Sequence, residues 1–268
     1  MSQALQETAR VDWSLSDPSL LRTQAYINGE WVDADNGATF KVYNPATHEV
    51  VAEVADVGAD ETRRAIEAAA VAQKAWAAKS AMERSVILKK WHDLIIENVE
   101  DLAILMTVEQ GKILAEARGE VAYAASFIEW FAEEGKRVYG DVLPLPQTDR
   151  RGIVIKQPVG VCAAITPWNF PAAMLTRKVA PALAVGCSMI AKPPHETPLS
   201  MTGLAELAHR AGLPAGLLNV LPTSTSKVVG DELCSNPTVR KLTFTGSTAV
   251  GKLLTRQCAD TLKRLSME

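Results

Sequence analysis

The chain has 268 residues, of which 47% are hydrophobic and 22% are charged, proportions that are ordinary for a folded globular protein. The formal net charge of −3 leaves no basic excess, so we expect neither a nucleic acid nor an anionic membrane as a partner. The apolar runs stop short of the roughly 18 residues of a membrane span, and the N-terminus lacks the apolar stretch of a secretory signal. The composition therefore predicts a cytoplasmic protein.

The four cysteines, Cys162, Cys187, Cys234 and Cys258, are widely spaced. No pair has the close spacing of a metal site or a redox motif, so we expect no metal centre. Because free cysteines are usually small buried hydrophobes, we interpret all four in that way.

The first half of the chain has mainly helical patterns. Residues 1–22 are predicted to form a flexible, loosely held arm. Asn28-Gly29 then favours a hairpin, because both residues tolerate positive φ. Residues 60–108 have the apolar spacing of two or three helices, and residues 114–139 predict another. Within that last helix, the aromatic stripe of Tyr123, Phe127, Trp130 and Phe131 is interpreted as core packing.

Residues 141–158 differ in character, with three prolines around an alternating apolar segment. Proline confines a strand to an edge, so this segment predicts a protruding β-structure or a plain surface excursion. From residue 159 to the end, strand and helix patterns alternate. Such alternation indicates an α/β fold with a mostly parallel, Rossmann-like sheet and helices on both faces.

The most informative stretch is residues 165–192. An apolar strand pattern ends at Thr166-Pro167-Trp168-Asn169, a turn signal that no strand interior accepts. A helical pattern follows and breaks at Gly186 before a second strand. Open α/β sheets bind their ligands in loops at the carboxyl ends of such strands, so we expect the site here.

These residues resemble the aldehyde dehydrogenase family, through the motif TPWNFP, the Gly186-Cys187 break and Lys192-Pro193. The segments 244–247, FTGS, and 265–268, LSME, extend the resemblance in the family's order. Residues 167–178, PWNFPAAMLTRK, are most similar to succinate-semialdehyde dehydrogenases. The resemblance implies an aldehyde dehydrogenase fold in which residues 23–140 and 159–268 form the cofactor-binding domain and residues 141–158 an oligomerisation β-arm, hence a homo-oligomer, either a dimer or a tetramer.

The resemblance also implies a nicotinamide dinucleotide site. Its residues would be Ile165, Thr166, Pro167, Trp168, Lys192, His195, Gly230, Phe244, Gly246 and Ser247. In the family Lys192 would bond the adenosine ribose. His195 stands where a carboxylate would reject a 2′-phosphate, so NADP is slightly favoured over NAD, although His195 could equally be an ordinary loop histidine. Ser247 at a helix start could likewise be only an N-cap.

For the reaction, the resemblance implies oxidation of an aldehyde to the acid through a cysteine thioester. Asn169 would stabilise the oxyanion, and Glu268 would be the general base. Arg177, with Phe170 and Met174 nearby, could bind the far carboxylate of succinate semialdehyde or a similar aldehyde; a structural ion pair is the alternative.

None of the four cysteines has the context of the family's nucleophile. We therefore expect this chain to be the N-terminal half of such an enzyme, without its catalytic domain and inactive alone. The alternative is a non-catalytic module that binds a dinucleotide or another subunit.

Overall fold

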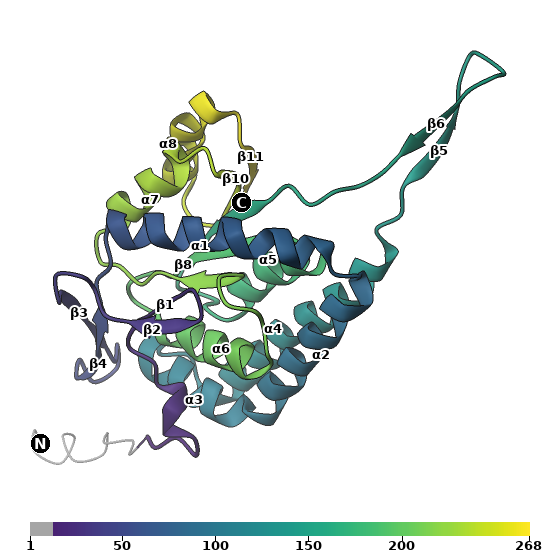
Figure 1. The fold of residues 1–268 in the computed structure, drawn as a ribbon. Coiled ribbons are helices and arrows are strands. Elements are labelled where there is room, and N and C mark those ends of the chain that lie inside the picture. Colours follow the sequence, from purple (N-terminus) through teal and green to yellow (C-terminus); the bar gives the residue numbers. More distant parts are fainter. Residues whose placement is uncertain (1–12) are drawn as a thin grey trace, which may run out of the picture.

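The computed structural model describes residues 13–268, and a seven-stranded sheet lies at its centre (Figure 1). The order of the strands is β11-β10-β7-β8-β9-β1-β2. Five strands are parallel: β7 (Val161–Ile165), β8 (Ser188–Lys192), β9 (Leu218–Val220), β10 (Val239–Phe244) and β11 (Arg264–Met267). The antiparallel β1 (Ala25–Ile27) and β2 (Glu30–Val32) complete one edge. The prediction of a mostly parallel α/β sheet is confirmed.

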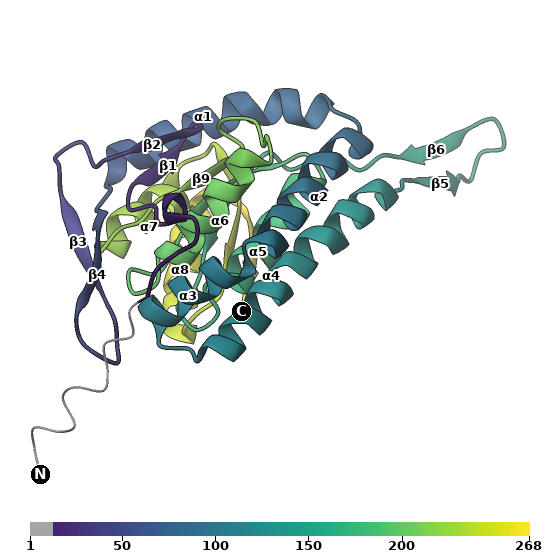
Figure 2. The same ribbon diagram turned by 90° about the horizontal axis from the view of Figure 1, so that it is seen from below.

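Helices cover both faces of this sheet (Figures 1 and 2). The connections between its strands contain α5 (Ala173–Ala184), α6 (Leu199–Arg210), α7 (Ser226–Ser235) and α8 (Thr248–Cys258). Alternate residues of β7 enter two separate cores. Ala163 packs in the core that contains residues of α7 and α8, whereas Ala164 packs in the core that contains residues of α5 and α6. Burial of both faces accounts for the continuous apolar runs of the central strands.

The N-terminal half contributes four long helices, α1 (Ala59–Ala78), α2 (Ala81–Glu97), α3 (Val99–Gln110) and α4 (Leu114–Glu134). Ser80 and Glu83 form a reciprocal capping box that starts α2, and Gly111 ends α3 at φ +83°. The region predicted as two or three helices thus contains three. Across residues 13–268 no helix has the length and apolar character of a membrane span.

The aromatic stripe on α4 is only partly in the core. Phe127 and Phe131 pack against it, but Tyr123 and Trp130 are 48% and 64% exposed. The buried face of α4 instead consists mainly of small and aliphatic residues, including Ala117, Val121, Ala124 and Ile128. The prediction of core packing was therefore wrong for Tyr123 and Trp130, because close contact with α2, α3 and α5 uses the neighbouring face.

Two hairpins lie outside the main sheet, at opposite ends of the molecule (Figures 1 and 2). The first, β3 (Thr39–Tyr43) with β4 (Val50–Ala55), was not predicted. The second, β5 (Asp141–Pro144) with β6 (Arg151–Val154), extends far from the body and confirms the protruding β-arm. Its apolar side chains Val142 and Ile153 are 70% and 74% exposed.

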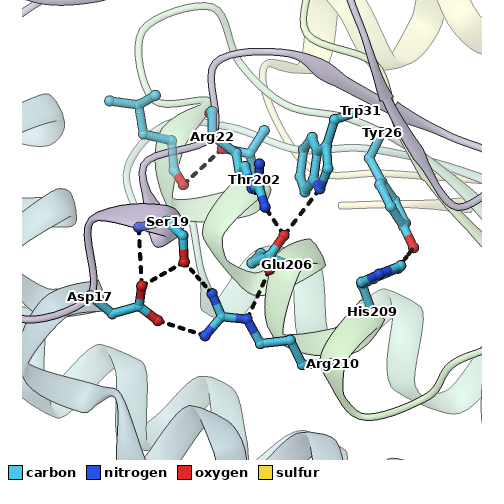
Figure 3. A network of polar contacts seen from close by, with 10 residues as sticks. Asp17, Ser19, Arg22, Tyr26, Trp31, Thr202, Glu206, His209 and Arg210 are labelled. Atoms are coloured by element: carbon cyan, nitrogen blue, oxygen red, sulfur yellow. Dashed lines mark hydrogen bonds and ion pairs between the residues drawn. The ribbon is translucent and has the colours of Figure 1, made fainter.

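Residues 13–22, which precede β1, are bound to α6. For this part of residues 1–22 the prediction of a loosely held arm was wrong. Leu20, in the short helix η1 (Pro18–Leu20), is fully buried. The Glu206 carboxylate accepts hydrogen bonds from Arg22 Nε at 3.0 Å and Arg210 Nε at 2.8 Å (Figure 3). Arg210 also pairs with Asp17 at 2.6 Å. Residues 1–12 lie outside the described residues.

Candidate active site

The topology places a crevice at the carboxyl ends of β7 and β10. The chain proceeds from β7 to β8 and β9 on one side and then returns to β10 on the other side of β7. Such a reversal is the topological switch point where open α/β sheets bind ligands. The TPWNFP loop follows β7, and Thr245-Gly246-Ser247 follows β10.

The first loop is anchored at its start and exposed at its tip. The Ile165 carbonyl accepts a hydrogen bond from Thr245 N at 3.2 Å, which joins the two loops. Thr166 is buried, and its hydroxyl has no hydrogen-bond partner within residues 13–268. Pro167 is half-buried, whereas Trp168, Asn169 and Phe170 are exposed. Three predicted site residues therefore lie at the exposed tip of this loop.

Glu268 lies beside the second loop. Its N–H donates to the Phe244 carbonyl, and its own carbonyl accepts from Gly246 N, both at 3.0 Å. The carboxylate accepts from Thr245 Oγ1 at 3.2 Å, and Arg177 Nη2 is 3.8 Å away. The backbone is thus fixed by the sheet while the carboxylate, 58% exposed, faces the crevice.

Sequence reasoning missed Lys178 and Thr245. Lys178 Nζ donates to Thr245 Oγ1 at 2.7 Å, so Thr245 connects the ammonium to the Glu268 carboxylate. Burial lowers the pKa of Lys178 below its ordinary value, and Glu268 opposes that shift. A signal was available, because Lys178 lies three residues after Leu175 on the apolar side of α5.

Glu268 lines two cavities. One, of about 550 Å³, is also lined by Phe244, Gly246, Ser247 and residues of α8. The other, of about 500 Å³, is also lined by Arg177 and Lys178. Arg177 contacts Met174 Sδ at 3.8 Å and lies 5.7 Å from the Phe127 ring centroid. The structure therefore brings Arg177, Met174 and Glu268 together.

Lys192, at the end of β8, is 4% exposed and donates to Ser226 Oγ, at the start of α7, at 2.7 Å. Burial lowers the pKa of Lys192 to about 8, and Glu196 opposes this effect. Gly230 lies one turn further along α7. Ser247 is the N-cap of α8, since its Oγ accepts from Val250 N at 3.4 Å.

His195 has different surroundings. Its ring Nδ1 is 3.2 Å from Glu196 Oε2, and its side chain is 54% exposed. It lines a third cavity, of about 440 Å³, together with Trp168 and residues of β3. His195 therefore shares a cavity with Trp168, and Lys192 does not line that cavity.

All four cysteines are buried, as predicted. The Cys162 thiol donates to Cys187; this bond, together with burial, raises the pKa of Cys162, and the same bond lowers the pKa of Cys187 to about 6. Burial likewise raises the pKa of Cys234 and of Cys258. Because all four side chains are shielded from solvent, none of them offers an accessible thiolate.

Known proteins are similar to this chain in sequence and fold. The sequence profile described as "Aldehyde dehydrogenase family" matches residues 31–268. The chain is 63% identical to glutarate-semialdehyde dehydrogenase of Pseudomonas putida, over 95% of this chain and 53% of that protein. It is 60% identical to the succinate-semialdehyde dehydrogenase [NADP(+)] GabD of Escherichia coli, over 95% of this chain and 52% of that protein. The chain thus spans about half the length of these curated relatives.

A solved aldehyde dehydrogenase of Brucella melitensis biovar abortus superimposes with a TM-score of 0.94 at 59% identity, covering 96% of this chain and 53% of that one. Fold and site together define a doubly wound α/β domain with a ligand crevice at its switch point. The chain belongs to the aldehyde dehydrogenase family.

Replacement of Gly246 and of Gly230 by alanine should have opposite effects on the free energy of unfolding. A Cβ at Gly246 would lie 2.5 Å from Cζ of the buried Phe244 ring, whereas a Cβ at Gly230 would meet no atom within 4 Å. We expect Gly246→Ala to lower the free energy of unfolding by about 1–3 kcal/mol through overpacking. Gly230→Ala, inside α7, should raise it by roughly 0.5–1 kcal/mol. Urea unfolding of both variants measures this difference, and equal effects would refute the assigned contacts.

Proposed function

We propose that this chain provides the dinucleotide-binding part and several active-site groups of an NAD(P)-dependent dehydrogenase that oxidises an ω-carboxy aldehyde to the acid. The observation that carries the proposal is the position of Arg177 and Glu268. A carboxylate-binding cation and a carboxylate base lie 3.8 Å apart at the edge of the switch-point crevice. Formation of NAD(P)H with succinate semialdehyde in the complete enzyme, followed by absorbance, tests it. Dinucleotide binding without turnover would favour the non-catalytic alternative.

The crevice fits a dinucleotide. The buried Thr166 hydroxyl lacks a partner in the described part of the chain, and Gly230 leaves room on α7 for close approach. Lys192 uses one of its three N–H donors, on Ser226, and so has donors left for the adenosine ribose. At the N-terminus of α8, the N–H groups of Thr248 and Ala249 have no partner within residues 13–268 and are available to a phosphate. A nicotinamide dinucleotide bound by these residues would supply the hydride acceptor for the oxidation.

The other groups act on the aldehyde carbon. The Asn169 side-chain amide makes no hydrogen bond within residues 13–268, so it is available to an oxyanion, and Glu268 is available to take a proton from water. Thr245 orients the Glu268 carboxylate because it accepts from Lys178 and donates to Glu268. Since all four cysteines are buried, we assign none of them the role of nucleophile.

The substrate class follows from Arg177. Within residues 13–268 its guanidinium has one loosely held carboxylate partner, so several N–H donors are left for a substrate carboxylate. The names of the two relatives, glutarate- and succinate-semialdehyde dehydrogenase, denote aldehydes with such a second carboxyl group. Phe170 and Met174 would contact the carbon chain between the two ends.

For the β5–β6 arm we propose oligomerisation, with a second copy of the chain as the partner. The exposed Ile153 would then be buried in the assembly, so Ile153→Asp should weaken association tenfold or more, about 1.4 kcal/mol. Light scattering after size exclusion measures the assembly. Val71→Asp, at an equally exposed position on α1, is the control. A monomeric parent protein would contradict the role.

The lowered pKa of Lys192 predicts how NADP affinity depends on pH. Its pKa is about 8 in the free protein, and a 2′-phosphate near the ammonium would raise it on binding. The charged form is then lost above pH 8 only in the free protein, so the affinity for NADP should fall about tenfold from pH 7 to pH 9. Fluorescence titration checks this. Lys192→Arg should make the affinity independent of pH in this range, and an equally flat profile for the parent protein would refute the contact.

Replacement of Arg177 tests the substrate class. In the complete enzyme, Arg177→Ala should lower kcat/KM for succinate semialdehyde by about tenfold to hundredfold, the worth of a charged hydrogen bond of 1.5–3 kcal/mol. It should change kcat/KM for a neutral aldehyde such as butanal less than threefold. Arg240→Ala, on the opposite end of β10, is the matched control. Equal losses for both aldehydes would show that Arg177 does not bind the carboxylate.

A further inference from the structure

A buried ion pair lies behind the TPWNFP loop. Lys112, between α3 and α4, pairs with Glu120 on α4, and their side chains are 10% and 1% exposed. Desolvation of two charges is costly and is offset only where further hydrogen bonds satisfy both groups. The other contacts of Lys112 and Glu120 therefore indicate the role of the pair.

Those contacts converge on residues 169–173. Lys112 Nζ donates to the Asn169 carbonyl at 3.0 Å and lies 4.0 Å from the Phe170 ring centroid. Glu120 Oε1 accepts from Ala172 N at 3.0 Å and Ala173 N at 3.3 Å. The pair thus holds both the exposed tip of the loop and the first N–H groups of α5.

The start of α5 has no side-chain cap of its own. The N-cap of α5 is Ala172, which has no side-chain hydrogen-bonding group, so Glu120 binds the N–H groups of Ala172 and Ala173. At the tip, the carbonyl of Asn169 is bound by Lys112 while its side-chain amide remains available. Lys112 thus holds the backbone of Asn169, and Glu120 holds the start of α5, which carries Arg177.

We propose that Lys112 and Glu120 are positioning residues that fix the Asn169 amide for the reaction. The proposal rests on the proposed function, in which Asn169 stabilises an oxyanion that exists only after the aldehyde is attacked. Misplacement of the amide then affects the transition state more than the binding of substrate or dinucleotide.

The test is a double-mutant cycle in the complete enzyme, between Lys112→Met and Asn169→Ala. Lys112→Met should lower kcat at least tenfold, while KM and the dinucleotide dissociation constant change less than about threefold. Asn169→Ala should lower kcat about 100-fold. With Asn169→Ala already present, Lys112→Met should have less than a threefold further effect, since it acts through the lost amide.

Lys89→Met is the matched control, because Lys89 pairs with Glu133 across α2 and α4, outside this loop. It should leave kcat unchanged. If the unpaired Glu120 prevents Lys112→Met from folding, the double variant Lys112→Met/Glu120→Gln, which leaves no buried charge, replaces it in the same cycle. The value of kcat is calculated per folded enzyme molecule, so that partial unfolding of a variant does not lower it.

The outcomes separate the two claims. If Asn169→Ala leaves kcat unchanged, the proposed role of Asn169 is wrong. If it lowers kcat but Lys112→Met has no effect, or lowers kcat by the same factor with and without the Asn169 amide, the positioning proposal is wrong.

Discussion

The first turns of α5 and α6 depend on carboxylates that are distant in the sequence. A helix start leaves four backbone N–H groups without intrahelical partners. The N-cap positions of these helices are Ala172 and Pro198, neither of which provides a side-chain cap. Glu120 binds the N–H groups of Ala172 and Ala173, and Glu109 binds those of Leu199 and Ser200. The N-terminal helices α3 and α4 thereby fix the two helices that cover one face of the sheet.

The two carboxylates differ in how their charge is compensated. Glu109 is almost fully buried and pairs with no cation within residues 13–268; burial raises its pKa to about 8, although the N–H groups of Leu199 and Ser200 favour the ionised form. Desolvation therefore outweighs these donors. Glu120 pairs with Lys112 in addition to its two N–H donors. The carboxylate that lies behind the TPWNFP loop is thus the one whose charge is balanced, and the cation that balances it also reaches Asn169.

The predictions that succeeded were those set by local patterns. Asn28-Gly29 forms the tight hairpin with both φ values positive, and the alternation after residue 159 gives the parallel sheet. Arg177 and Glu268 could be named from motifs, and the structure brings them together. Lys112 and Glu120 could not be found in this way, because their role depends on the place where α4 meets the start of α5. The fastening of residues 16–22 likewise depends on Glu206 and Asp101, far along the chain.

The weakness of the Arg177–Glu268 contact matters for the proposed chemistry. At 3.8 Å, with side chains 33% and 58% exposed, the pair is screened by solvent and contributes on the order of 0–1 kcal/mol. A short bidentate pair would occupy the guanidinium and hold Glu268 away from water. The observed geometry instead leaves N–H donors on Arg177 for a substrate carboxylate, while Thr245 keeps Glu268 oriented. Under the proposed function, Arg177 binds the substrate carboxylate and Glu268 accepts a proton; at 3.8 Å the two groups can belong to one site without neutralising each other.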